Sequence, residues 1–445
     1  MSDADIDTQR SDLVPSRERK EVAAPQDGQR SLIAPIHRLV PDVLLEIFIT
    51  ATRSEDEYRQ LSTARAISRV STFWRRLARD TPQLWMCVAV SSRRDLELYM
   101  AHYFSLTGDS ALDLCCDSAV VVQLFLDTLR PYASRWRSVS IIGQAGAFRP
   151  SRGDPFVTPN LSLLRIMNDQ GLDEEGLLSC FDAPRLQELT LAIAGVTSDH
   201  VFVLRSASCA LTRVSINAMT SFPVAHVIPL LQQCGATLQR LDINMPPLPL
   251  SFEAMPTGPT RNVCAMHSLT ALELGYEACA LLSYIDAPHL NELRVFDTPS
   301  YFLEVFLDYA TRHSLPHLTR LRIDISDSAF DVDTGPGLIR VLERLNALEE
   351  LYIANSTVSE KFLRCLVCRD GVPPLVPNLR AMDLLNGYEG WIPDRIVKVV
   401  QAVYASRAKR RRVCGTMVAV LDSAVGDSMM IEYLDTARSQ SIEVS

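Results

Sequence analysis

Two cysteines have the spacing that suits metal binding or thiol redox chemistry. Cys365 and Cys368 are separated by two residues, so both thiols can face one centre. A structural zinc site needs four ligands, and no second cysteine pair lies nearby in the sequence. The pair also lies inside an apolar run with a helical pattern. We therefore favour two buried or half-buried thiols and expect no bound metal.

Other patterns that carry catalysis are missing from the sequence. The eight histidines are dispersed, and no His-Glu-x-x-His, Gly-x-Ser-x-Gly or Gly-x-x-x-x-Gly-Lys pattern occurs. The sequence therefore predicts a protein that is not an enzyme and that binds no cofactor. An enzyme with an unrecognised site stays open as an alternative, and it would need a pocket with convergent titratable groups.

A basic run, Arg407-Ala408-Lys409-Arg410-Arg411-Arg412, follows the amphipathic segment 395–404. One interpretation is that these cations stabilise the C-terminus of a solvated helix, where the helix dipole favours positive charge. The other interpretation is a nuclear-import signal or a patch for an acidic partner. The sequence alone leaves both open.

Composition narrows the class of partner and the cellular compartment. The formal charge of -9 and the pI near 5.5 argue against nucleic acid and acidic membranes as partners. The eleven cysteines are odd in number, scattered and mostly in apolar runs, as is typical of thiols in a reducing compartment. Residues 1–31 are polar, so we expect a disordered tail without a signal peptide. No apolar run reaches the length of about 18 residues that a membrane span needs, and we expect a soluble protein of the cytoplasm, the nucleus or both.

Residues 35–90 form one predicted helical unit. A first helix is expected over about 41–52, with Asp42 in its first turn. An acidic break at 54–57 separates it from a longer helical stretch, in which apolar residues recur at steps of three and four up to Leu77. Thr81-Pro82 ends that stretch, and the alternating residues 86–90 predict a strand that enters the next domain.

This unit resembles the F-box of large fungal families in which an F-box precedes leucine-rich repeats. The matching segments are Pro35-Ile36-His37-Arg38-Leu39 with Pro41, Leu44-Leu45-Glu46-Ile47-Phe48, Ile67-Ser68-Arg69-Val70-Ser71, Phe73-Trp74-Arg75-Arg76-Leu77-Ala78 and Thr81-Pro82-Gln83-Leu84-Trp85. Val40 stands where many members have proline, and Ser71 and Phe73 replace the usual cysteine and arginine.

The resemblance implies that the unit docks on the Skp-type linker of a cullin-RING ubiquitin ligase. A module of about fifty residues has too little interior for all its large apolar side chains, so some must pack on a partner or on the first strand of the next domain. The candidate adaptor-binding residues are Leu39, Pro41, Leu44, Ile47, Phe48, Val70, Trp74 and Leu77.

A Leu-x-x-Leu-x-Leu-like hexad recurs through the rest of the chain, at steps of 25, 25, 25, 27, 31, 21, 28, 30 and 31 residues. The hexads begin at Trp136, Leu161, Leu186, Leu211, Leu238, Leu269, Leu290, Leu318, Leu348 and Leu379, with 111–114 as a degenerate earlier candidate. Proline precedes several hexads, and helix-length segments lie between them. Each unit is therefore predicted to be a strand, a loop and a helix.

The pattern resembles the leucine-rich repeat. One unit cannot bury its leucines alone, so the predicted fold class is α/β, with the short all-α module followed by a solenoid over 91–435 whose parallel sheet is concave and whose helices are convex. The asparagine or cysteine usual after the hexad is missing, so we expect an irregular horseshoe. A proline-rich excursion at 246–259 is expected to protrude as a loop, and 436–445 to form a flexible tail.

Strand alternation predicts which side chains the concave face displays. They are Glu188, Thr190, Ala192, Arg213, Ser215, Asn217, Arg240, Asp242, Asn244, Glu292, Arg294, Phe296, Arg320, Arg322, Asp324, Glu350, Tyr352 and Ala354. Arginines and aromatic residues are common interface anchors, and such a patch suits an acidic or phosphorylated protein segment. The candidate substrate-binding residues are therefore Arg294, Phe296, Arg320, Arg322 and Tyr352, and a merely solvated sheet face is the alternative.

The sequence and the resemblance together predict a non-catalytic substrate receptor. The helical module would dock on the Skp-type linker, the horseshoe would hold an unknown protein substrate, and the chain would be a monomer within a hetero-complex. The rival prediction is a repeat scaffold in which the module only caps the solenoid and no ligase is engaged.

Overall fold

The computed structural model describes residues 36, 39–53, 57–143, 154–168, 177–194, 202–206, 210–220, 222–246, 263–299, 301–313, 315–324, 335–354, 359–385 and 394–410. The predicted tails at 1–31 and 436–445 and nearly all of the proline-rich excursion lie outside the described residues. Within the described residues, no helix combines the length and the apolar character that crossing a membrane requires.

Three short helices form the N-terminal module: α1 (Pro41–Thr52), α2 (Glu57–Val70) and α3 (Thr72–Arg79). The first helix has the predicted bounds, with proline and Asp42 in its first turn. The longer stretch expected after it is two helices, because Ser71 has an extended backbone and its hydroxyl accepts a hydrogen bond of 3.1 Å from the amide of Trp74. The buried apolar residues of these three helices are Leu44, Phe48, Leu61, Ala64, Ile67, Trp74 and Ala78.

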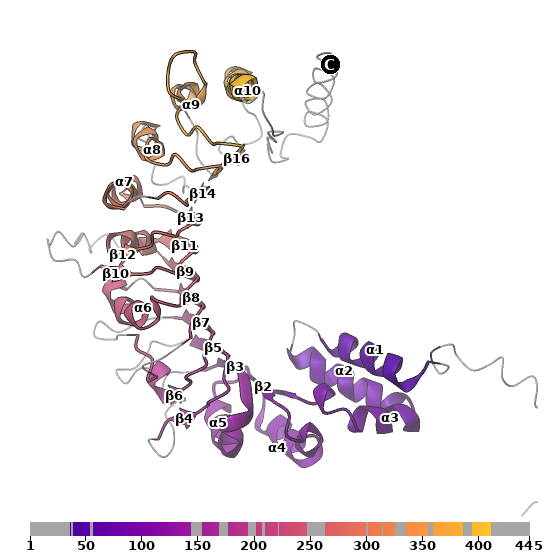
Figure 1. The fold of residues 1–445 in the computed structure, drawn as a ribbon. Helices are drawn as coiled ribbons and strands as arrows, with labels where there is room; N and C mark the ends of the chain where they lie inside the picture. The colour runs from indigo at the N-terminus through magenta and orange to yellow at the C-terminus, as the bar shows by residue number, and fades with distance from the viewer. Residues whose placement is uncertain are drawn as a thin grey trace, which may run out of the picture.

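The rest of the described chain is built on one open sheet of twelve parallel strands (Figure 1). In order across the sheet the strands are β1 (Cys87–Val90), β2 (Leu112–Cys116), β3 (Trp136–Ile142), β5 (Leu163–Asn168), β7 (Glu188–Ile193), β8 (Arg213–Ala218), β9 (Arg240–Met245), β11 (Ala271–Tyr276), β13 (Glu292–Phe296), β14 (Arg320–Asp324), β15 (Glu350–Ala354) and β16 (Ala381–Leu385). Figure 1 shows the sheet lining the inner side of an arc, with helices on its outer side. The molecule is therefore mixed α/β, and each of the ten predicted hexads carries a strand.

Neighbouring strands are aligned so that equivalent hexad positions lie side by side. Glu188 is paired with Arg213, and Arg320 with Glu350, which reproduces the hexad steps of 25 and 30 residues. The leucine that opens each hexad from Leu161 to Leu379 is at most 1% exposed, and two further apolar positions of each hexad from Leu161 to Leu348 are buried behind the sheet. These continuous apolar rows form the core.

The elements on the outer side of the arc vary more in type and length than the strands on its inner side. Its elements are α4 (Arg93–His102), α5 (Val122–Leu129), α6 (Ile228–Cys234), the 3-10 helix η9 (Glu277–Ser283), α7 (Phe302–Arg312), α8 (Gly335–Leu342), α9 (Glu360–Leu366) and α10 (Asp394–Arg410). Two small parallel pairs, β4 (Phe156–Val157) with β6 (Phe181–Asp182) and β10 (Cys264–Ala265) with β12 (Ile285–Asp286), also lie outside the main sheet. The shortest step, 21 residues, carries the 3-10 helix η9 and the short strand β12 in place of an α-helix, so the outer layer is irregular there.

The sheet begins inside the segment assigned to the module, because β1 is its first strand. Its four residues are all buried instead of alternating, since α2 covers the inner face of β1 and β2. Tyr58 packs there on Cys87, Ala89 and Cys115. The Tyr58 hydroxyl donates to the carbonyl of Val90 at 3.3 Å and accepts from the amide of Asp117 at 3.0 Å. We call these contacts of Tyr58 the joint, and they fix the module against the first strands.

At the other end of the arc, the first residue of the basic run is structural. Arg407 is 3% exposed, and its guanidinium donates to the carbonyls of Leu366, Leu375 and Val376 at 2.6 to 3.2 Å. It therefore ties α10 to the last residue of α9 and to the chain that follows it. The side chains of the next three residues and the last two residues of the run lie outside the described part of the chain.

We predict that Arg407→Ala lowers the free energy of unfolding by about 2–4 kcal/mol, because two buried carbonyls and one partly buried carbonyl lose a charged donor. Urea denaturation measures the change, and hydrogen exchange should show faster opening of α9. The matched control is Arg380→Ala, which removes an exposed ion pair of 3.3 Å with Glu349 and should change stability by at most about 0.5 kcal/mol. Equal effects of the two substitutions would contradict the structural role of Arg407.

Candidate functional site

The module exposes one apolar face. Leu39, Val40, Val43 and Ile47 follow one another at helical spacing, and each is at least 36% exposed. We call these four residues the module face. A shallow, mostly apolar hollow runs along α1 beside them, flanked by the carboxylates of Asp42 and Glu46. Large apolar side chains gathered in this way mark a surface that binds something.

The predicted adaptor-binding residues divide into two groups. Leu39, Pro41, Ile47 and Val70 are exposed, whereas Leu44, Phe48 and Trp74 are buried and Leu77 packs partly buried against the core. The rings of Phe48 and Trp74 meet at 4.7 Å, which holds α1 on α3. The three buried side chains therefore support the module and cannot contact a partner directly. Helical periodicity identified both faces of α1 without showing which one the protein covers.

The concave face brings together the arginines and the tyrosine that the sequence singled out. Arg294 is paired in register with Arg322, and Arg322 with Tyr352. Arg294 is nevertheless engaged, because it lies 2.6 Å from Glu292 and 3.9 Å from Glu273. Arg320 lies 3.3 Å from Glu350, which also accepts from the hydroxyl of Tyr352 at 3.2 Å. Arg322 is exposed and forms no ion pair with any side chain that the structure describes.

Two predicted members of the concave surface are less available than expected. Phe296 is only half-exposed, because its ring lies over Gly275 on the neighbouring strand. A Cβ added at Gly275 would lie 2.6 Å from Cζ of Phe296 and from Oδ1 of Asn244. Ala354, predicted to be displayed, is 5% exposed. Phe296 therefore fills a gap in the sheet surface and does not stand out from it as an anchor.

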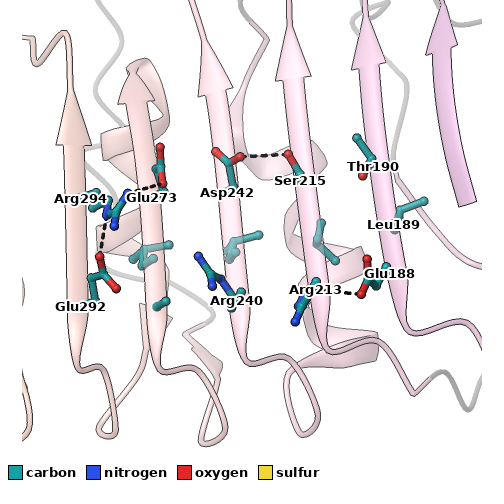
Figure 2. A pocket seen from close by; sticks show the side chains of 14 residues that line it. Glu188, Leu189, Thr190, Arg213, Ser215, Arg240, Asp242, Glu273, Glu292 and Arg294 are labelled. Carbon is teal, nitrogen blue, oxygen red and sulfur yellow. Dashed lines mark hydrogen bonds and ion pairs between the residues drawn. The ribbon is translucent and has the colours of Figure 1, made fainter. Parts of the chain in front are cut away.

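A hollow of about 210 Å³ lies on the concave face over β7 to β13 (Figure 2). We call it the concave hollow. Three arginines and four carboxylates line it: Arg213, Arg240, Arg294, Glu188, Asp242, Glu273 and Glu292. Ala271 has register neighbours Arg240 and Glu292, and its small side chain leaves space between them. Arg213 pairs with Glu188 at 3.1 Å, and Arg294 with Glu292.

Two carboxylates of the concave hollow are poorly compensated. Asp242 and Glu273 are register neighbours on β9 and β11, and both are partly buried. Asp242 accepts from the Ser215 hydroxyl at 3.0 Å, while the one ion pair of Glu273 among the described side chains is the long contact with Arg294. Burial raises the pKa of Asp242, and burial together with the negative charge of Asp242 raises the pKa of Glu273. The protein holds these charges close together at a cost in stability.

Glu273 is a functional residue of the concave hollow that the prediction from strand alternation does not include. It lies on the strand of the hexad that begins at Leu269. Alternation within 271–275 places Glu273 on the same face as Asp242 and Arg294. The signal was therefore present in the sequence.

The described residues contain no group of three or more metal-ligating side chains. Cys365 is exposed on α9 and Cys368 is half-buried just after it, so the pair is more exposed than a buried thiol pair would be. Comparison with known proteins adds no relative: no protein-family model matches the chain, and no curated protein matches it.

We predict a characteristic pH dependence for Asp242 and Glu273. Because folding raises both pKa values, the folded chain holds these protons more tightly than the unfolded chain. Their contribution to stability is therefore fully present below the ordinary carboxyl pKa of about 4 and is lost as pH rises through the raised values. Thermal melts of Asp242→Asn with Glu273→Gln should show a higher melting temperature than wild type at pH 8, with the gap closing toward pH 4.

Glu188→Gln serves as the control for this experiment, since it neutralises a carboxylate of the same hollow that is paired with Arg213. It should give no stabilisation at pH 8. If the double variant has the same melting temperature as wild type at pH 8, or a lower one, the two negative charges do not destabilise the folded protein.

A second prediction concerns Gly275. We expect Gly275→Ala to lower the free energy of unfolding by about 1–3 kcal/mol, because the new methyl group displaces the ring of Phe296. Adding Phe296→Ala should recover part of this loss, and a urea denaturation cycle over the two positions measures the coupling. Gly337→Ala in α8 is the control: its nearest neighbour is the flexible Leu303 side chain at 3.2 Å, so no comparable loss is expected. Additive effects at positions 275 and 296 would refute the close contact.

Proposed function

We propose that this protein is a non-catalytic, F-box-like substrate receptor of a Skp/cullin/F-box-type ubiquitin ligase. One observation carries the proposal: a small helical module with an exposed apolar face is joined firmly to an arc whose inner face displays charged side chains. One end of the chain is thus suited to a constant partner, and the other to a variable one.

The module supports the first half of the proposal. Its three helices span the segment that carries the F-box resemblance, and its interior is already filled by Leu44, Phe48 and Trp74. The module face therefore has no partner within the described chain, although leaving it in water is unfavourable. A linker that covers this face would contribute binding energy through apolar burial. The apolar hollow along α1 is the place where its side chains would insert.

The arc supports the second half. A strand in every unit, aligned hexads and outer helices fit a leucine-rich-repeat-like solenoid, in which a long inner face is available to one protein segment. The inner face is charged and hydrogen-bonding, whereas the module face is apolar. This difference fits a permanent contact at the module and an exchangeable contact on the arc.

The proposed activity is positioning. The linker would connect the module to the ubiquitin-transferring subunits, and the arc would hold a substrate whose lysines are then at high effective concentration near them. The joint supports this role because its contacts hold α2 against the first two strands of the arc. The ion pair of 3.7 Å between Glu57 of α2 and Arg165 of β5 adds a second tie across the joint.

We predict that Val43→Asp with Ile47→Asp abolishes binding of a recombinant Skp-type linker while the protein stays folded. Both side chains are more than 40% exposed, so the variant leaves the core intact but places two carboxylates where the linker needs apolar contact. Co-purification measures binding, and circular dichroism melts measure folding. Val120→Asp is the matched control, because Val120 is 92% exposed on the arc.

Wild-type protein that fails to bind the linker would overturn the ligase assignment and favour the repeat scaffold. A folded Val43→Asp/Ile47→Asp variant that binds as tightly as wild type would instead show that the linker contacts another surface.

A further inference from the structure

We propose that the concave hollow and Arg322 together bind one extended protein segment that carries a basic and an acidic side chain four residues apart. This inference deepens the proposed function, since it names the class of substrate segment that the receptor takes. The basic side chain lies between Asp242 and Glu273, and the acidic side chain pairs with Arg322.

The basic subsite rests on an uneven distribution of charge pairs within the concave hollow. Glu188 and Glu292 each have an arginine within 3.1 Å. Among the described side chains, Asp242 accepts a hydrogen bond from the Ser215 hydroxyl and forms no ion pair, and Glu273 forms only the contact of 3.9 Å with Arg294, while the charge of Arg240 acts on both carboxylates from a longer distance. Four carboxylates and three arginines line the hollow, so one negative charge is in excess. Ala271, which lies beside Glu273 on the same face of β11, has a small side chain that leaves space for a ligand group. A lysine or arginine of a partner would supply the missing positive charge.

The acidic subsite rests on Arg322. Its register neighbour Arg294 has the same charge but is engaged by Glu292 and Glu273, whereas Arg322 is exposed and has no ion pair among the described side chains. Its other register neighbour, Tyr352, is already oriented by Glu350. Like charges side by side on neighbouring strands are unfavourable, so an incoming carboxylate or phosphate at Arg322 relieves repulsion as well as forming a pair.

The separation of the two subsites sets the spacing in the partner. Glu273, Arg294 and Arg322 lie side by side on three successive strands, so Glu273 and Arg322 are separated by two interstrand spacings. A cation placed midway between Asp242 and Glu273 is half a spacing further away. At about 4.8 Å for each step the subsites are about 12 Å apart. An extended chain advances about 3.3 Å for each residue, and side chains on one face recur every second residue. Positions i and i+4, about 13 Å apart, match this distance, while i and i+2 fall far short.

Arg240 is the competitor that the structure itself provides. It is exposed on β9, forms no ion pair among the described side chains, and its positive charge counteracts part of the rise in the pKa of Asp242. The pKa of Asp242 is raised even in the presence of Arg240. A partner cation must therefore share the acidic pair with Arg240, and removing Arg240 should strengthen binding of the basic side chain.

Selection of a displayed library of random 12-residue peptides on the full-length protein tests the inference. We expect enriched peptides to carry Lys or Arg and Asp or Glu four positions apart, well above their frequency in the input library. Selection on Arg322→Glu should replace the preferred acidic residue by a basic one, and selection on Asp242→Asn with Glu273→Gln should remove the preference for a basic residue. Selection on Arg240→Gln should keep both preferences, and the selected peptides should bind this variant more tightly than they bind wild type.

Synthetic versions of an enriched peptide, with glutamate or phosphoserine at the acidic position, distinguish a carboxylate from a phosphate as the better anion. Arg322→Glu should weaken the preferred version by about tenfold or more. The inference is overturned if no peptide is enriched, if enriched peptides lack the pair, or if the preferences are unchanged by the substitutions. Linker binding by the same variants should match wild type, so failure of this site and failure of the ligase assignment give different results.

Discussion

The alignment of the twelve strands is the constraint on which every other feature depends. Each unit contributes one strand and a few leucines, too little to fold alone, and its apolar residues are covered only when the next unit is paired in register. A shift by one residue would turn Leu293 toward solvent and Arg294 into the core. The same alignment that buries the leucines therefore places Asp242, Glu273, Arg294 and Arg322 in one row.

The two surfaces of the molecule differ in how their side chains are compensated. On the module, the buried pair of Phe48 and Trp74 completes the interior and leaves Val43 and Ile47 without apolar cover. On the concave face, arginines and carboxylates are mostly paired, and the exceptions lie close together. An uncovered apolar face supports affinity through burial, whereas unpaired charges support selectivity and the rate of encounter.

Much of this arrangement could be predicted from the sequence, and the failures have physical reasons. Hexad spacing gave the strands, their register and the adjacency of Arg322 and Tyr352, because strand geometry depends on local pattern. It could not show that Leu44 and Trp74 lie inside, since helical periodicity does not identify which face is covered. Phe296 folds onto Gly275 and Arg407 onto distant carbonyls through contacts between separate segments, which no local pattern contains. The F-box-like and ligase assignments stay predictions.

The outer layer can vary in length without changing the inner sheet. Steps between units range from 21 to 31 residues, yet the inner strands remain neighbours in one sheet. Insertions on the outer side therefore leave the inner face undisturbed, while gain or loss of a whole unit between β3 and β7 would move the concave hollow along the arc by one strand width, about 4.8 Å, relative to the module. The distance between the module face and the concave hollow can thus change in steps of one strand width, while the side chains of each surface stay the same.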